Sequence, residues 1–315
     1  MTPASGVPDF VSYSGLIVDD IVLADGRTLF NTLGGGSTHA LAGMRVWSDS
    51  LGYFAAVGDD LAMEHRQTLE EMGIDLRGLI VREGYPTARA WQLFEPDERR
   101  IEVFRTSIDD FYRLEARFSE MPADYLKARG YYISHGAVFD MVEVITQLRA
   151  VNPDACVLWE PTPMQHEVRE TEFRMVLAQV SGVSPDRGEA RAITGRETTR
   201  EAVDTLLDWG AKVVAIRMGA RGSAVFTADG ESYAIPAAPV SVVDTTGGGN
   251  AYIGGFLVGL ANDDGPAEAG AKAAVSASFA IEQFGVPTFN DALRQTALDR
   301  LAWTRERIAP GATLD

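Results

Sequence analysis

One stretch constrains the fold of this chain more than any other. Residues 243–250 read Val-Asp-Thr-Thr-Gly-Gly-Gly-Asn, and the apolar, small-residue run 251–257 follows them. The β-branched run 240–243 predicts a strand, and the run after the glycines predicts a helix. Glycines at such a turn let the backbone fold back and expose N–H groups, which form an anion site with the helix dipole. The alternative, a plain turn before a tightly packed helix, needs only one or two glycines.

Composition limits the class of protein. The 315 residues, with 46% hydrophobic and 23% charged residues, suit one large α/β domain or two small ones. No apolar run approaches the ~20 residues of a membrane span. Segment 1–9 has no signal-peptide pattern, and Cys156 is the only cysteine, so a cytoplasmic location is expected. The net charge of −17 argues against nucleic acid and anionic membranes as partners.

Strand-like and helix-like runs alternate along the chain, which predicts a mostly parallel sheet covered by helices on both faces. A hairpin over 88–104, with a turn at 95–98, is the exception, and we expect it to form a small separate sheet with 21–23. No Pro- or Ser-rich linker divides the chain, so we expect a single domain, 1–315, with a lid formed by about 19–31 and 86–106. The expected strands are two runs within 10–23, then 51–57, 131–134, 156–159, 176–183, 213–216 and 224–227, and the expected helices are 37–47, 61–72, 141–148, 202–207 and 266–284.

The glycine stretch resembles a known signature. Asp244-Thr245-Thr246-Gly247-Gly248-Gly249-Asn250 is similar to the Asp-Thr-Thr-Gly-x-Gly-Asp motif of ribokinase-like (phosphofructokinase-B type) carbohydrate kinases. The resemblance implies a three-layer α/β/α sandwich with a β-lid, and ATP-dependent phosphoryl transfer to a hydroxyl of a sugar or sugar-like molecule. It implies that Gly247, Gly248 and Gly249 cradle the migrating group. The family's catalytic base is the last Asp, whereas Asn250 is an amide and cannot accept a proton at neutral pH.

The resemblance also assigns an acceptor site. The family has a Gly-Gly turn with Asn five residues after the first Gly, and here Gly34-Gly35 fits while His39 occupies the Asn position. The family's diol-binding Asp follows a strand-ending Gly, and Gly15 and Asp20 fit that spacing. Asp20, Gly35 and His39 would therefore hold the acceptor. From the residues alone, Asp20 could equally be a solvated loop carboxylate. For His39, a packing role is a stronger alternative than acceptor binding.

Two further motifs concern the nucleotide and its ions. Asp186 and Glu189 fit the family's Pro-Asn-x-x-Glu motif, which supports Mg²⁺, although acids at a helix N-terminus have the same pattern. Arg217, Gly219 and Gly222 fit the family's Thr-x-Gly-x-x-Gly, which touches the ATP phosphates, although Arg217 could equally be a surface ion-pair residue. By the same resemblance, Asp244 and Thr246 would bind a monovalent cation such as K⁺. Ser276 would border the nucleotide base.

The sequence lacks the motif spacings of other nucleotide-binding and zinc-binding classes of protein. A P-loop motif is missing, and neither glycine cluster has the Gly-x-Gly-x-x-Gly context of a dinucleotide fold. The four histidines, at 39, 65, 135 and 166, are scattered without zinc-ligand spacing, and Cys156 is expected to be inert core.

Two questions stay open at this stage. Asn250 favours a rival hypothesis, a protein that keeps the pocket but binds its ligand without turnover. Against it, a carboxylate elsewhere, such as Glu160 at a strand end, could reach the acceptor hydroxyl. The apolar-alternating hairpin strands would be unprotected edges, which predicts that the lid covers the acceptor and pairs with a second copy in a homodimer.

Overall fold

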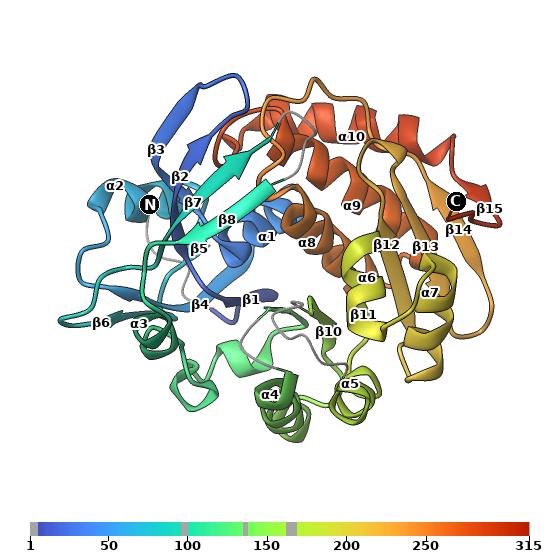
Figure 1. Cartoon of the computed structure of the whole chain (residues 1–315), viewed down its shortest axis with the longest axis horizontal. Helices are drawn as coiled ribbons and strands as arrows, with labels where there is room; N and C mark the ends of the chain where they lie inside the picture. The colour runs from blue at the N-terminus through green and yellow to red at the C-terminus, as the bar shows by residue number, and fades with distance from the viewer. Residues whose placement is uncertain (1–5, 96–99, 135–137, 162–168, 315) are drawn as a thin grey trace.

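The computed structural model describes residues 6–95, 100–134, 138–161 and 169–314. Its main sheet has eleven strands in the order β15-β14-β13-β12-β11-β10-β9-β1-β4-β5, with β6 also paired to β4 (Figure 1). The pairs from β12 to β5 are parallel, and β12 to β15 pair antiparallel. The strands are β1 (Phe10–Ser14), β4 (Leu51–Gly58), β5 (Ile74–Asp75), β6 (Leu79–Arg82), β9 (Gly130–Ser134), β10 (Cys156–Trp159), β11 (Gly182–Val183), β12 (Val213–Arg217), β13 (Ser223–Thr227), β14 (Ser232–Ile235) and β15 (Ala309–Pro310).

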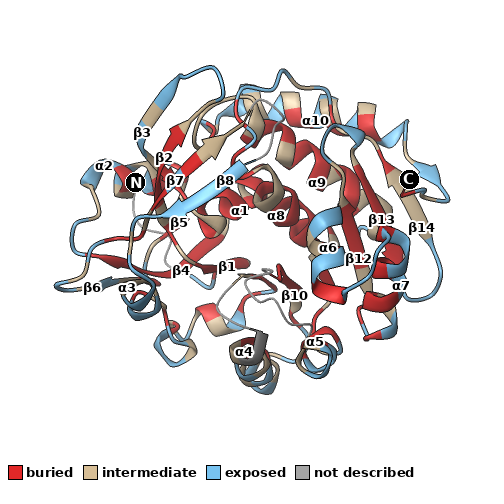
Figure 2. Ribbon diagram, in the orientation of Figure 1, coloured by how far each residue is buried: buried red, intermediate tan, exposed pale blue. Residues whose placement is uncertain are grey.

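Helices cover both faces of this sheet, as the alternation predicted. Side chains alternate between faces along a strand, so Val11 and Tyr13 of β1 pack in one core while Phe10 packs in the other. The first core includes α4, α5, α6 and α7, and the second includes α1, α2, α8 and α9 (Figure 2). The helices are α1 (Gly36–Arg45), α2 (Met63–Glu71), α3 (Ile108–Arg113), α4 (Val138–Val151), α5 (Glu170–Leu177), α6 (Arg187–Thr194), α7 (Thr199–Asp208), α8 (Gly248–Ala261), α9 (Pro266–Ile281) and α10 (Asp291–Arg305).

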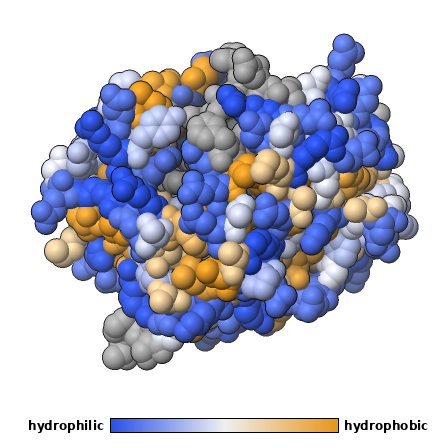
Figure 3. All heavy atoms as spheres, turned by 90° about the horizontal axis from the view of Figure 1, so that it is seen from below, coloured by the Kyte–Doolittle hydropathy of each residue, from blue (hydrophilic) through white to orange (hydrophobic). Residues whose placement is uncertain are grey.

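The surface agrees with a chain that carries a large net charge. The face around α4 and α5 is mostly hydrophilic, with apolar residues in scattered patches (Figure 3). Within the described ranges, no helix is long and apolar enough to cross a membrane.

A second sheet of four strands stands apart from the first, in the order β3-β2-β7-β8. It consists of β2 (Ile17–Val22), β3 (Thr28–Gly34), β7 (Arg89–Phe94) and β8 (Arg100–Phe104). The predicted hairpin is confirmed, since β7 and β8 pair antiparallel, and β2 joins it through β7. Most of the predicted turn at 95–98 lies outside the described residues. The edge strand β8 is exposed along its whole length (Figure 2).

Two predicted strands are wrong. Residues 240–243 pair with no described strand, and the segment is held instead by the Val243 amide, which donates to the Ile281 carbonyl at the end of α9 (2.8 Å). Over 176–183, α5 extends to Leu177 and only 182–183 form a strand. Val176, Leu177 and Val180 are buried with helical spacing, so the apolar run marks a helix face rather than a strand.

The two glycine runs of the sequence meet because α1 and α8 pack unusually closely. A β carbon at Gly43 would lie 2.1 Å from the Ala251 carbonyl oxygen, and one at Gly254 would lie 2.1 Å from the Ala40 carbonyl oxygen. The helices therefore touch backbone to backbone, which only glycine allows. Their N-termini, at Gly36 and Gly248, consequently face the same cavity region.

Candidate active site

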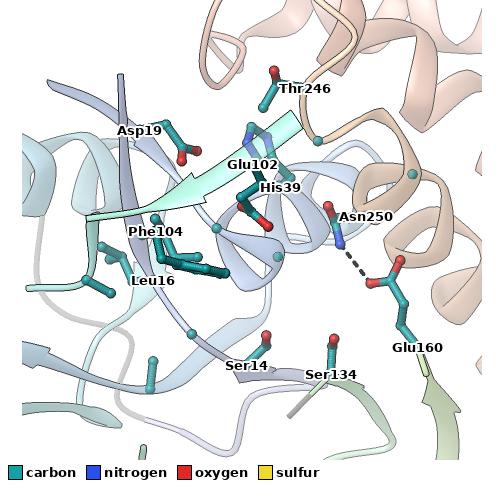
Figure 4. A pocket seen from close by; sticks show the side chains of 18 of the residues that line it. Ser14, Leu16, Asp19, His39, Glu102, Phe104, Ser134, Glu160, Thr246 and Asn250 are labelled. Carbon is teal, nitrogen blue, oxygen red and sulfur yellow. Dashed lines mark hydrogen bonds between the residues drawn. The ribbon is translucent and has the colours of Figure 1, made fainter. Parts of the chain in front are cut away.

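A cavity of about 520 Å³ lies between the small sheet, α3, and the N-terminal ends of α1 and α8. Several of its lining residues stand at or just past the C-terminal ends of parallel strands. They are Arg217 of β12 and, labelled in Figure 4, Ser14 of β1, Ser134 of β9 and Glu160 after β10. Ligands of open α/β sheets bind at this edge.

The first end of the cavity is the start of α8. Gly247 has a φ of 73°, and a β carbon there would lie 2.0 Å from His39 Cγ. A β carbon at Gly249 would lie 1.7 Å from Arg217 Nη1, so the guanidinium sits directly beneath the first helical turn. Both glycines line the cavity, whereas Gly248 faces Ile281 of α9. A helix N-terminus with an arginine beneath it is suited to bind an anion.

Arg217 is held between two carboxylates rather than at the surface. Its Nη2 donates to Glu189 Oε2 (2.7 Å) and forms an ion pair with Glu160 Oε1 (3.2 Å), and its side chain is 15% exposed. Burial raises the pKa of Glu189, and the Arg217 charge opposes that rise. The surface ion pair that was the alternative for Arg217 is therefore ruled out.

Asn250 and Glu160 are in direct contact across the cavity wall. Asn250 Nδ2 donates to Glu160 Oε2 (2.7 Å) and approaches Tyr132 Oη (3.1 Å), and Tyr132 Oη also donates to Glu160 Oε2 (Figure 4). Burial raises the pKa of Tyr132 well above its usual value, so this hydroxyl remains a donor. Glu160 lines the cavity and is buried.

Spacing predicted Asp20 as the carboxylate that binds the acceptor, but its neighbour Asp19 is the residue in the cavity lining. Asp20 does not line the cavity: its carboxylate pairs with Arg105 and accepts from the Asn31 amide (2.9 Å). Asp19 lines the cavity instead, and its Oδ1 accepts from Gln92 Nε2 (3.0 Å). Neighbouring residues of a strand face opposite sides, so only one of the two can point inward. Burial raises the pKa of Asp19 to about 7.

His39 and Gly35, which are predicted to hold the acceptor, both line the cavity, and His39 lies beside Gly247 at the start of α8. His39 is 4% exposed, and neither ring nitrogen has a hydrogen-bond partner among the described residues. Burial lowers its pKa to about 4, so the ring is neutral at pH 7. Gly35 has a φ of 86°, and a β carbon there would meet the Ile17 backbone nitrogen at 2.6 Å. A buried imidazole without partners, facing a cavity, is a ready contact for a ligand hydroxyl.

The residues predicted for ions also line or border the cavity. Asp186 and Glu189 form a reciprocal capping box at the start of α6, with both bonds at 2.7 Å. Asp244 Oδ1 accepts from the Thr246 amide (2.9 Å), and Thr246 Oγ1 is buried without a partner in the described part of the chain. No group of three or more His, Cys, Asp or Glu residues able to hold a metal is found among the described residues.

The remaining sequence predictions concern residues that are not in the cavity lining or not among the described residues. Gly219 and Gly222 belong to a turn outside the cavity lining, where a β carbon at Gly222 would lie 2.1 Å from the Ile235 carbonyl oxygen. Ser276 joins α9 to α1 by donating to the Gly43 carbonyl (2.8 Å). Burial raises the pKa of the Cys156 thiol to about 11, as an inert core cysteine requires. His135 and His166 lie outside the described residues.

The wall missed by sequence reasoning is aromatic and acidic. Phe104 and Phe111 line the cavity with ring centroids 5.2 Å apart in an edge-to-face arrangement, and Tyr112 lines it beside them. Glu102, Glu115 and Arg100 also line it. Phe104, Glu102 and Arg100 come from β8, Phe111 and Tyr112 come from α3, and Glu115 follows α3. No motif marks these segments, and the pairing of β7 with β8 could have pointed only to the β8 residues.

Comparisons with known proteins agree with this geometry. Residues 9–293 match the pfkB family of carbohydrate kinases. The cytidine kinase of Thermococcus kodakarensis is 28% identical over 263 residues, covering 80% of this chain and 88% of that protein. A 5-dehydro-2-deoxygluconokinase of Clostridium perfringens is 24% identical over 255 residues, covering 76% and 75%. The structure of a protein termed ribokinase II from E. coli, in complex with ATP and Mg²⁺, superposes with a TM-score of 0.73 at 17% identity, over 93% and 99% of the two chains.

The chain belongs to the pfkB family of carbohydrate kinases. The predicted ribokinase-like fold is confirmed, with a mostly parallel main sheet and a small second sheet as the lid. The protein is accordingly a kinase, an ATP-dependent phosphotransferase with an alcohol as acceptor.

Proposed function

We propose that this chain transfers the γ-phosphoryl group of ATP to a hydroxyl of an uncharged, sugar-containing acceptor with a planar ring, a nucleoside being the model case. The observation that carries the proposal is the presence of two unlike ends in one cavity. The start of α8, with Arg217 beneath Gly249, suits a phosphoryl group. Asp19, on the small sheet across the cavity, and His39, packed beside Gly247, are buried and suit the hydroxyls of a sugar.

Mg²⁺ fits the nucleotide side as a phosphate-bound ion with a water shell, because the described carboxylates form no closed cage. Asp186 and Glu189 are the residues that would hold that shell, and Arg217 would contact the phosphates. When bound, the ion would neutralise charge on the phosphate oxygens. The orphaned Thr246 Oγ1, next to Asp244, supports a K⁺ site there. Transfer rates that are equal in K⁺ and in a bulky organic cation would contradict it.

Two features of the lid end support the choice of acceptor. The Phe104–Phe111 pair and Tyr112 offer aromatic surface of the kind on which planar rings pack. Asp19, Glu102 and Glu115 set three carboxylates against the single guanidinium of Arg100 in this part of the lining. An anionic sugar acid or sugar phosphate would be repelled, whereas N–H and O–H donors would be favoured.

Asn250 stands, in this proposal, where the family has its catalytic Asp, and it favours a second candidate function. A protein that lost its base could keep the cavity and bind ligand without turnover. General-base help is worth roughly 10²–10⁴-fold, and phosphoryl transfer has a loose transition state. Measured ADP release separates the two functions.

The remaining proposals concern assembly and location. The four-stranded sheet would act as the lid of a single domain over 1–315. Exposed Trp91, Val103 and Ile101 on its strands would pair with a second copy, and a monomer in sedimentation at high concentration would contradict this. A cytoplasmic location is supported by the family membership and the lone cysteine.

The test of function uses cytidine, ribose and 5-dehydro-2-deoxygluconate as probes. We expect cytidine to raise the melting temperature most in the presence of Mg-ATP and to release ADP, since binding to the native state stabilises it. A larger shift and faster turnover with the sugar acid would contradict the proposed acceptor class. Specific binding with no ADP release from any probe would favour the binding protein.

A further inference from the structure

The contact between Asn250 and Glu160 bears on a step that the proposed function leaves unassigned, the removal of the acceptor's proton. Asn250 is the third residue of α8, one position after the glycine that lies over Arg217. Its amide cannot act as a base. The amide does, however, donate to the Glu160 carboxylate at 2.7 Å, so a carboxylate lies one hydrogen bond behind the base position.

Glu160 has the capacity to act in that position. An ionised carboxylate has about four lone-pair sites. Tyr132 Oη and Asn250 Nδ2 donate to Oε2, and the Arg217 guanidinium forms an ion pair with Oε1. These three contacts leave a lone-pair site on a carboxylate that lines the cavity, and that site can receive a proton.

Asp19, a carboxylate on the small sheet, is less well placed to act as the base. Asp19 lies on the small sheet, across the cavity from Asn250 and Glu160 (Figure 4). Its Oδ1 is held by Gln92, away from the start of α8. A base must reach the hydroxyl that attacks the phosphoryl group, and the phosphoryl end of the cavity is at α8.

We infer that Glu160 is the general base of this kinase and that Asn250 is its positioning residue. The inference rests on the proposed function. The acceptor oxygen forms a bond to the γ-phosphorus while the bond from that phosphorus to the β–γ bridging oxygen breaks, and ADP leaves with the electron pair. The acceptor's proton passes to the free site on the Glu160 carboxylate and from there to water.

The identity of residue 250 follows from this arrangement. An aspartate there would place a second carboxylate against Glu160, and two carboxylates that share a site cannot both ionise readily. With Asn250, Glu160 is the only carboxylate of the pair, and the hydrogen bond that Asn250 donates orients it. Gly36 provides the room, because a β carbon there would lie 3.0 Å from Tyr132 Oη and 3.3 Å from Asn250 Nδ2.

The test exchanges the two side chains. Glu160→Gln, Asn250→Asp and the double variant Glu160→Gln/Asn250→Asp are compared with wild type for cytidine-dependent ADP release, for calorimetric affinity for Mg-ATP, and for melting temperature. Glu160→Gln should lower kcat by about 100-fold or more with Mg-ATP affinity maintained. Asn250→Asp alone should give no gain. The double variant, with one carboxylate again, should recover at least about tenfold over Glu160→Gln.

Each outcome has a distinct meaning. Wild-type kcat in Glu160→Gln overturns the assignment of the base. A gain of about 100-fold in Asn250→Asp also overturns it, because the wild type would then have lacked a base. If the double variant loses as much kcat as Glu160→Gln at an unchanged melting temperature, the role of the two side chains is structural. That result would overturn the proposed exchange of their roles. No ADP release by wild type with cytidine, ribose or 5-dehydro-2-deoxygluconate contradicts the proposed function itself.

Discussion

The two ends of the cavity are built on different electrostatic principles. At the α8 end, the carboxylates Glu160 and Glu189 each contact Arg217, so buried charge is paired. At the lid end, Asp19 is buried with Gln92 as its hydrogen-bond partner, and desolvation raises its pKa to about 7. The carboxylates of one end therefore face a guanidinium, whereas the carboxyl group at the other end is poised to change its charge near pH 7.

This difference separates two tasks. Paired, rigidly held charges act on a group whose charge is constant, such as a phosphoryl group. A carboxyl group that titrates near neutral pH can accept or donate hydrogen bonds to hydroxyls, according to its protonation. Three predictions test whether the ends are independent in this way.

The largest effect is expected at the α8 end. Gly249→Ala places a methyl group where Arg217 Nη1 now lies, so either the guanidinium or the first turn of α8 must shift. A misplacement of about 1 Å costs on the order of 100-fold in rate, and we expect at least that loss in phosphoryl transfer. Steady-state ADP release measures it.

The matched control is Gly15→Ala at the lid end, where a β carbon would meet no heavy atom within 4 Å. Its melting temperature should stay close to that of wild type. If Gly249→Ala transferred phosphate at the wild-type rate, Arg217 would not be part of the phosphoryl site.

An intermediate effect is expected from a pair of neighbouring residues in β2. Asp19→Asn should weaken acceptor binding by about 10–100-fold, since hydrogen bonds to a charged group contribute roughly 1.5–3 kcal/mol. Asp20→Asn should leave acceptor affinity unchanged, because Asp20 contacts Arg105 and the Asn31 amide outside the cavity. Calorimetry with cytidine compares the two variants. A loss confined to Asp20→Asn would restore the original sequence prediction.

The smallest effect is on stability against pH. The pKa of Asp19 is raised in the folded state, so its contribution is fully present below the unfolded value of 3.8 and is lost as pH rises through about 7. The free energy of unfolding of wild type should therefore fall relative to that of Asp19→Asn between pH 4 and pH 8, by on the order of 1–3 kcal/mol. Denaturant titrations at both pH values measure this. Glu115, whose pKa burial also raises to about 7, is present in both proteins and cancels. If the free energies of unfolding of the two proteins changed in parallel with pH, Asp19 would not be the titrating group.

Sequence reasoning succeeded where a local rule dictates the structure. Gly247 and Gly249 open α8 because only glycine fits against His39 and Arg217, and Asp186 and Glu189 cap α6 with the predicted spacing. The parallel sheet and the β7–β8 hairpin followed from periodicity. Each of these features has a local mark in the sequence, which is a glycine run, a capping pair or an alternating pattern.

Sequence reasoning failed where contacts between residues far apart in the chain decide the structure. The choice between Asp19 and Asp20 depends on which face of β2 meets the cavity, and a spacing rule cannot resolve one residue. The run 240–243 is β-branched, but α9 holds it outside the sheet. The wall of Phe104, Phe111 and Tyr112 arises only when β8 and α3 come together. No local pattern encodes these tertiary contacts.

The backbone contact between α1 and α8 has a consequence for motion during the reaction cycle. With Gly43 against Ala251 and Gly254 against Ala40, the two helices cannot slide or separate without losing their packing. The distance from His39 to the glycine cradle is thus constant, whereas Asp19 lies on β2 of the lid and moves with it. Movement of the lid also changes the access of bulk water. Opening and closing would then govern both the approach of Asp19 to the acceptor and how much ATP is wasted by hydrolysis.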